Sequence, residues 1–265
     1  MILPRIITAA VGIPVVLTVM YIGGVPFFIF SLFIIIMSLY EYNIMMKISM
    51  KAVDTLSLFL CGVLFPFAFY FNGAENNSLD FFPLLVSFAV ILPFINEILR
   101  KEKYFERPAY TIVGIFLISF NLSYLILIRD LKPYGSKILF ITVFCVWLTD
   151  TAAYFIGSKF GKNKLNSVSP KKTIEGFIAS IIFSVAFMFL MAKVSPIFGI
   201  KQFVLFGLLI SLSGQLSDLA ESLIKRACGV KDSSNLLPGH GGFMDRFDSY
   251  FFVAPFVYYF VIFLR

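Results

Sequence analysis

Residues 174–192 read IEGFIASIIFSVAFMFLMA, and this run decides the fold class of the chain. Its one charged side chain, Glu175, lies at the start, and the residues after it are apolar or small. About 20 such residues in an α-helix cross the hydrocarbon core of a bilayer. The backbone of a helix satisfies its own polar groups in lipid. The run therefore predicts a transmembrane helix.

Eight further apolar runs of similar length lie along the chain. The nine expected spans cover residues 6–22, 26–45, 55–72, 81–98, 109–128, 137–157, 174–192, 203–222 and 248–264. The chain is 59% hydrophobic and 14% charged, whereas soluble domains carry about 25% charged residues. We therefore expect one all-α, polytopic integral membrane helical bundle over residues 1–265.

The basic residues indicate the orientation of this bundle. If the N-terminus is cytoplasmic, 16 of the 22 Lys and Arg residues fall on the cytoplasmic side and 6 on the other. Cytoplasmic loops of membrane proteins are enriched in Lys and Arg. We therefore expect a cytoplasmic N-terminus in the cell inner (plasma) membrane. The net charge of +7 fits such a basic face, and we expect no nucleic-acid partner.

A polar block precedes and overlaps the start of the run at 174–192. Residues 150–176 read DTAAYFIGSKFGKNKLNSVSPKKTIEG. Asp150 lies within an expected span, where a carboxylate usually has a function. Ser169 and Pro170 predict a helix N-cap followed by proline at the first helical position. A helix N-terminus favours anions. Lys164, Lys171 and Lys172 add full positive charge, although ordinary cytoplasmic-side lysines remain the alternative.

The expected span at 203–222 carries a polar stripe that continues beyond its end. Ser211, Gln215, Asp218, Ser222 and Lys225 are spaced by four, three, four and three residues, which places them on one helix face. Such a stripe in an apolar helix faces a cavity or other protein. Interhelical hydrogen bonds account for Ser211 and Gln215. Asp218 requires a cation, either Lys225 or a metal ion.

A second polar block follows this span. Residues 222–248 read SLIKRACGVKDSSNLLPGHGGFMDRFD. The turn around Gly241 and Gly242 exposes backbone N–H groups that suit an anion, and His240 is either part of that site or only a turn residue. Asp245 and Asp248 share a helix face, and paired carboxylates hold Mg²⁺. The alternative is that they are helix N-terminal acids favoured by the dipole.

Together the two blocks resemble a known family. The block 222–248 resembles the signature of phosphatidate cytidylyltransferases, also called CDP-diacylglycerol synthases. The matching positions are Ser222, Lys225, Arg226, Lys231, Asp232, Ser234, Leu237, Pro238, His240, Gly241, Gly242, Asp245, Arg246 and Asp248. The block 150–176 is similar to the family's other common stretch, with Ala152 where Gly is frequent and Ile174 where Trp is frequent.

The resemblance implies a reaction in which phosphatidate attacks the α-phosphorus of CTP, giving CDP-diacylglycerol and pyrophosphate. Because the attacking oxygen is already ionised, catalysis is mainly charge neutralisation and positioning. We expect N-terminal spans in residues 1–130 and a catalytic half in residues 131–265. The expected cofactor is Mg²⁺, with a second cation left open. The expected partners are CTP, phosphatidate and membrane lipids, with a homodimer left open.

The resemblance also assigns roles to residues. The expected catalytic residues are Asp218, Lys225, Arg226, His240, Asp245, Arg246 and Asp248. Among these, Asp218, Asp245 and Asp248 are the expected metal ligands. The expected substrate-binding residues are Asp150, Lys164, Ser169, Lys171, Lys172, Ser222, Lys231, Gly241 and Gly242.

Two other functions remain open at this point, and a third is disfavoured. A CTP-dependent lipid or polyprenol kinase would transfer the γ-phosphoryl group of CTP instead. A secondary transporter would also place acids inside membrane spans. A prenyltransferase is disfavoured, since the chain contains no DDxxD motif. Glu41 and Glu97, near the ends of expected spans, are interpreted as interfacial residues.

Overall fold

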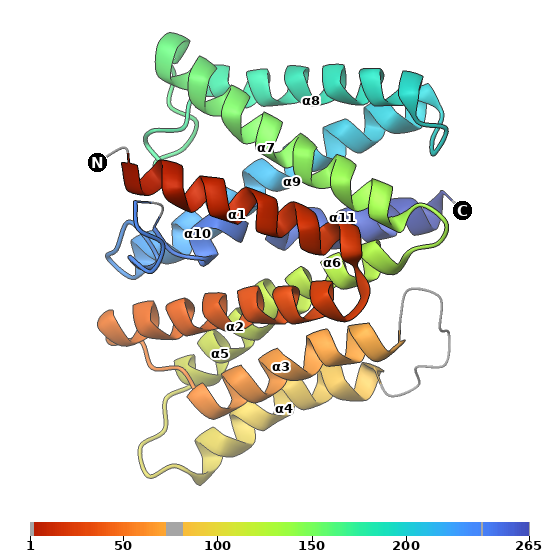
Figure 1. Ribbon diagram of the computed structural model, residues 1–265. Coiled ribbons are helices and arrows are strands. Elements are labelled where there is room, and N and C mark those ends of the chain that lie inside the picture. Colours follow the sequence, from red (N-terminus) through yellow and green to blue (C-terminus); the bar gives the residue numbers. More distant parts are fainter. Residues whose placement is uncertain (1–2, 73–81, 240, 265) are drawn as a thin grey trace.

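The computed structural model describes residues 3–72, 82–239 and 241–264, and these residues form a bundle of helices (Figure 1). The elements are α1 (Leu3–Ile22), α2 (Gly24–Ile48), α3 (Thr55–Asn72), α4 (Phe82–Leu99), α5 (Glu106–Gly114), the π-helical segment η1 (Ile115–Phe120), α6 (Asn121–Asp130), α7 (Gly135–Phe160), α8 (Ile174–Val194), α9 (Ile200–Ala227), α10 (Met244–Phe247) and α11 (Tyr250–Phe263).

Seven helical segments of the described chain are long and apolar enough to cross a membrane, and α5, η1 and α6 together form one of them. This confirms the prediction of an all-α, polytopic membrane bundle. Helices α1 and α11 match the first and last expected spans in position, and α11 has 14 residues. The total of nine spans stays a prediction.

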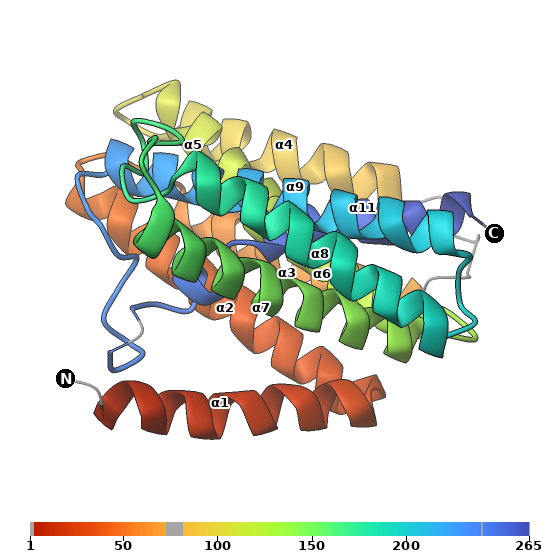
Figure 2. The same cartoon turned by 90° about the horizontal axis from the view of Figure 1, so that it is seen from above.

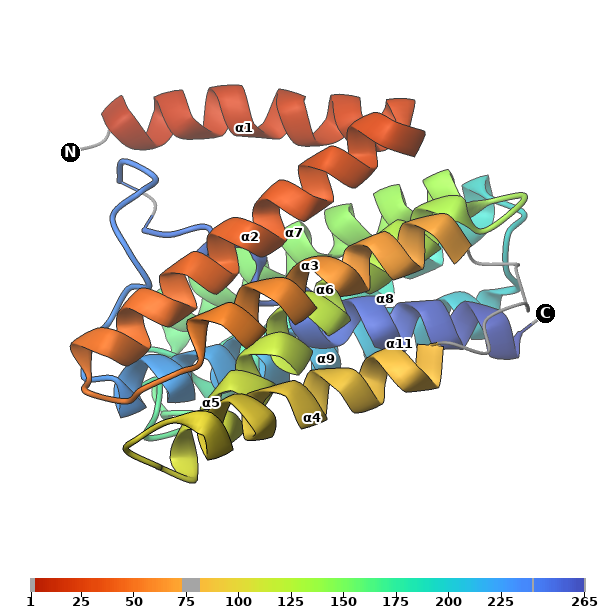
Figure 3. The same ribbon diagram turned by 90° about the horizontal axis from the view of Figure 1, so that it is seen from below.

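The two polar blocks lie at the same end of the bundle. Figure 1 shows the connections α7–α8 and α9–α10 at the end where the chain begins, whereas the connections α6–α7 and α8–α9 lie at the opposite end. Figures 2 and 3 show α1 lying along one side of the bundle. The alternation of the helices thus brings together two blocks that are separated in the sequence.

Close helix packing fixes the position of α9 among α7, α8 and α11. The hydroxyl of Ser184 on α8 donates to the carbonyl of Gly207 on α9 at 2.6 Å. A Cβ atom at Gly207 would lie 3.1 Å from the Ser184 carbonyl oxygen, so the two backbones approach closely only because Gly207 lacks a side chain. Phe203 and Phe206 on α9 are completely buried. The polar end of α9 is therefore held on a rigid core.

The start of α8 differs from the prediction. The predicted N-cap at Ser169 with Pro170 at the first helical position is wrong, since α8 begins at Ile174 and Thr173 is its N-cap. The Thr173 hydroxyl accepts a hydrogen bond from the Gly176 N–H at 3.1 Å. The Ser169 carbonyl instead accepts from the Lys172 N–H at 3.0 Å, which closes a turn before the helix.

Two acidic residues interpreted as interfacial are buried. Glu97 is 6% exposed and forms an ion pair with Arg107 at 2.8 Å. Glu41 has no exposed surface. The interfacial interpretation is therefore wrong for both residues. Glu97 is enclosed with Arg107, which lies ten residues further along the chain. Glu41 accepts hydrogen bonds from residues between 233 and 244.

Candidate active site

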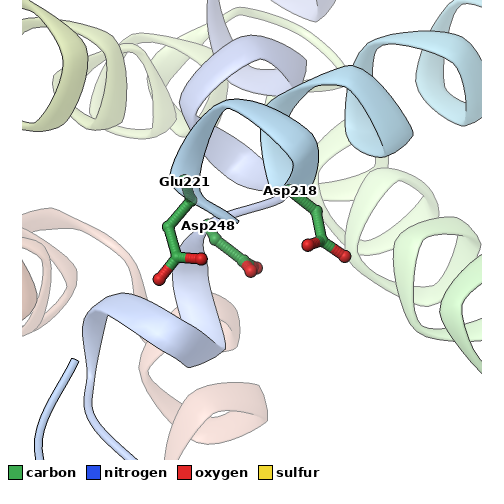
Figure 4. Close-up of side chains that lie close together, drawn as sticks. All are labelled: Asp218, Glu221 and Asp248. Atoms are coloured by element: carbon green, nitrogen blue, oxygen red, sulfur yellow. The ribbon is translucent and has the colours of Figure 1, made fainter. Parts of the chain in front are cut away.

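Three carboxylates meet at the polar end of the bundle. Asp218 and Glu221 come from α9, and Asp248 comes from the connection between α10 and α11. One oxygen from each lies within 4.8 Å of the others. Figure 4 shows the three side chains directed into the same space beside α9. Asp218 and Glu221 point there together because they are three residues apart on a helix.

The connection that carries Asp248 is held against α9. The hydroxyl of Ser217 on α9 donates to the Asp248 carbonyl and accepts from the Phe252 N–H at 3.2 Å. The Ser249 N–H donates to the Asp248 carboxylate at 2.7 Å. These bonds fix the backbone that follows Asp248, and the Ser249 N–H also orients the Asp248 carboxylate beside the other two acids.

The donor set of this cluster fits Mg²⁺. Three carboxylates so close repel one another unless a cation lies among them. Glu221 has no exposed surface, and its Oε1 has no hydrogen-bond partner among the described residues. A hard divalent cation takes carboxylate oxygens and completes its shell with water and substrate phosphates. The cluster therefore offers suitable ligands for such an ion.

Glu221 is not among the metal ligands expected from the sequence, which include Asp245 instead. The sequence contained a signal for Glu221, because it lies three residues after Asp218 and four before Lys225 on the polar side of α9. Among the described residues, the mutually close acids are Asp218, Glu221 and Asp248. The geometry favours these three as the metal ligands, and a direct metal contact of Asp245 stays a prediction.

Asp245 and Lys225 form a buried pair beside the cluster. Lys225 Nζ lies 2.6 Å from Asp245 Oδ1 and 2.5 Å from Glu221 Oε2. Asp245 Oδ2 also accepts from the N–H groups of Ser233 at 2.9 Å and Gly242 at 2.8 Å. Burial raises the pKa of Asp245, but the hydrogen bond and charge of Lys225 and these N–H donors outweigh it, so the pKa is lowered. Lys225 thus orients the acids.

Gly241 adopts a conformation that only glycine tolerates well. Its φ of +79° lies in the left-handed region, and a Cβ atom there would lie 2.7 Å from Asp245 Oδ2. The glycines of the turn therefore let the backbone close around Asp245. His240, the remaining predicted residue of this turn, lies outside the described residues.

Lys172 connects the α7–α8 loop to the cluster. Its Nζ lies 2.6 Å from Asp218 Oδ2, and the Ser222 hydroxyl lies 3.4 Å from Asp218 Oδ1. Asp150 on α7 lies within electrostatic range of Asp218, Lys172 and Arg246. The structure therefore brings Asp150 and Lys172 of the first block close to Asp218. The roles of Lys164, Ser169, Lys171 and Lys231 stay predictions.

The two polar blocks, which lie at this end of the bundle (Figure 1), also carry cations with exposed side chains. Among them are the predicted residues Lys164, Lys171, Arg226, Lys231 and Arg246. Arg226 also joins the two polar loops, since it donates to the Val168 carbonyl at 3.3 Å and the Val230 carbonyl at 3.0 Å. Ser169 lies in the turn before α8. The site thus combines an acidic centre with a basic surround, which suits a cation and anionic substrates together.

Comparison with known proteins assigns the chain to a family. The sequence model of the Cytidylyltransferase family matches residues 3–264. The chain belongs to this family. It is similar to proteins named phosphatidate cytidylyltransferase from Bacillus subtilis (strain 168), with 36% identity over 261 residues and 96% of each chain covered. A protein of the same name from Staphylococcus saprophyticus is 33% identical over 254 residues, with 95% of each chain covered.

Proposed function

We propose that this membrane protein transfers the CMP moiety of CTP to phosphatidate. A phosphate oxygen of phosphatidate forms a bond to the α-phosphorus of CTP. The bond between the α-phosphorus and the oxygen that it shares with the β-phosphorus breaks, and pyrophosphate leaves with that oxygen. The products are CDP-diacylglycerol and pyrophosphate. Relatives named phosphatidate cytidylyltransferase that match nearly the whole chain support this function. The single structural observation that carries it is the cluster of three carboxylates at the end of the bundle where both basic polar loops lie (Figure 1).

The reaction requires little proton transfer by the protein. A phosphate monoester has its second pKa near 6 and is largely ionised at neutral pH, so the attacker already carries negative charge. Asp218, Glu221 and Asp248 would hold Mg²⁺, which when bound neutralises charge on the phosphates. Lys172 holds the Asp218 carboxylate, and Lys225 holds Glu221 and Asp245. The exposed cations attract and orient the two anionic substrates.

The chemistry is assigned to the C-terminal half, residues 131–265, which supplies both polar blocks. We place the protein in the plasma membrane with its reactive end facing the cytoplasm. The majority of Lys and Arg on that side and the common position of the N-terminus and both polar loops support this orientation (Figure 1). Acyl chains of phosphatidate would then reach the site from the inner leaflet. A homodimer stays a prediction.

Product analysis tests this function. The purified protein is incubated with phosphatidate, Mg²⁺ and CTP labelled at the α-phosphorus, and lipids are then extracted. We expect label in a CMP-bearing lipid and release of one pyrophosphate for each lipid formed. Formation of CDP with an unlabelled phosphorylated lipid would instead identify a CTP-dependent lipid kinase. Absence of any CTP consumption would contradict both enzymatic functions.

A further inference from the structure

A second buried carboxylate lies outside the acid cluster, on a helix of the N-terminal half. Glu41 on α2 has no exposed surface. Its Oε1 accepts from the Ser234 hydroxyl at 2.6 Å and the Phe243 N–H at 2.9 Å. Its Oε2 lies 2.8 Å from both the Ser233 hydroxyl and the Met244 N–H. Four donors from the segment between α9 and α10 and from the first residue of α10 thus converge on one side chain.

These contacts compensate for the burial of the charge. A buried carboxylate without partners is strongly unfavourable, and none of the ion pairs among the described residues involves Glu41. Hydrogen bonds to an ionised acceptor are roughly twice as strong as neutral ones. The packing is also close, because a Cβ atom at Gly242 would lie 2.3 Å from Glu41 Oε2. Glu41 therefore fixes the path of this segment.

A chain of polar contacts connects Glu41 to the acid cluster. The Ser233 hydroxyl lies 2.8 Å from Glu41 Oε2 and 2.9 Å from Asp245 Oδ2. Asp245 pairs with Lys225, and Lys225 pairs with Glu221. Displacement of Ser233 would therefore alter the position of Asp245 and, through Lys225, that of a candidate metal ligand.

The same helix also supports the end of α9. Lys51, just after α2, donates to the Ala227 carbonyl in the last turn of α9 at 2.6 Å. Met46 on α2 contacts Cys228, the next residue after α9, with the two sulfur atoms 3.5 Å apart. The C-terminal end of α2 thus contacts both the helix that carries the acids and the segment that follows it.

We propose that Glu41 is a positioning residue for the reaction, acting through Ser233 and Asp245 on the acid cluster. The proposal rests on the function proposed above. It makes the N-terminal half part of the catalytic architecture, because one carboxylate there orients the segment that holds Asp245. Glu41 itself contacts no substrate.

The test compares Glu41→Gln with a matched control, Asp54→Asn. Glutamine keeps the shape of Glu41 but replaces one acceptor oxygen with an NH₂ group that faces two donors. Asp54 is also a buried carboxylate at this end of the bundle, and it accepts from Asn96 at 2.7 Å and Arg100 at 2.8 Å without contacting the segment between α9 and α10. We expect kcat of the Glu41→Gln variant to fall about 10²-fold, with little change in KM for CTP, and kcat of Asp54→Asn to stay within about threefold of the wild type.

A second readout does not depend on activity. Lys231 is exposed and lies in the segment that Glu41 holds. Limited trypsin cleavage after Lys231 should be about tenfold faster in the Glu41→Gln variant, because loss of the acceptor favours local opening. The Asp54→Asn variant should be cleaved there at the wild-type rate. This measurement remains valid even if the wild-type protein transfers no CMP, so failure of the proposed function is distinguishable from failure of this inference.

A double-mutant cycle tests the route through Ser233. Glu41→Gln and Ser233→Ala should together reduce kcat no more than the stronger single variant, since both interrupt one chain of contacts. If the loss of kcat in the double variant equalled the product of the two single losses, the two residues would act independently, and this route would be overturned. Wild-type kcat and wild-type cleavage in a folded Glu41→Gln variant, or equal losses in Glu41→Gln and Asp54→Asn, would overturn the positioning role.

Discussion

At the scale of single residues, two adjacent lysines have different environments and should differ in function. Lys172 is half-buried with its Nζ 2.6 Å from Asp218 Oδ2, whereas Lys171 is exposed on the same turn. Hydrogen bonds to charged groups contribute about 1.5–3 kcal/mol. Lys172→Met should therefore lower kcat/KM about 10- to 100-fold, because it removes the partner of Asp218. Lys171→Met should lower kcat/KM much less, through a modest rise in KM for CTP.

Steady-state kinetics of the two variants at saturating phosphatidate checks this difference. The melting temperatures of both proteins in detergent serve as the control for folding. If Lys171→Met reduced kcat/KM as much as Lys172→Met, the pairing of Lys172 with Asp218 would have no special role.

At the scale of elements, the helices were predictable and their ends were less so. The polar stripe on α9 was predicted from its spacing, and four of its five residues, Ser211, Gln215, Ser222 and Lys225, are buried as expected. The start of α8 was misplaced, because Ser169 and Pro170 form a local pattern that suits either a cap or a turn. Backbone hydrogen bonds between the two sides of the loop stabilise the turn. One of them runs from the Leu165 N–H to the Lys172 carbonyl at 2.8 Å. Such contacts leave no signal in a short sequence window.

The burial of Glu41 shows the same limit at longer range. Its donors lie on residues 233, 234, 243 and 244, about 200 residues further along the chain. A carboxylate near the end of an apolar run looks interfacial when only its neighbours in sequence are considered. Both of its oxygens are occupied only when α2 packs beside the segment between α9 and α10. The residue types of the candidate site were therefore predictable from the sequence. The hydrogen bonds to Glu41 that hold the neighbouring segment in place were not.

At the scale of the whole molecule, the orientation in the membrane is testable. We expect the polar blocks in the cytoplasm and the α8–α9 connection outside, because most Lys and Arg lie at the end of the bundle that carries the polar blocks. Cysteines introduced at exposed Ser167 and Lys201 report the two ends, and the three native cysteines are buried. A membrane-impermeant maleimide should label Lys201→Cys in intact spheroplasts and Ser167→Cys only after permeabilisation. The reverse pattern would contradict the orientation.

The central claim is that Asp218, Glu221 and Asp248 hold a divalent cation that enables CMP transfer. The most direct measurement is the affinity of the purified protein for Mn²⁺, determined from the electron paramagnetic resonance signal of the free ion. The proteins compared are the wild type, Glu221→Gln and Glu102→Gln, and Glu102 is an exposed acid outside the cluster. We predict that Glu221→Gln weakens Mn²⁺ binding at least tenfold and loses CMP transfer, while Glu102→Gln matches the wild type. Wild-type Mn²⁺ affinity and wild-type transfer in Glu221→Gln would contradict the account.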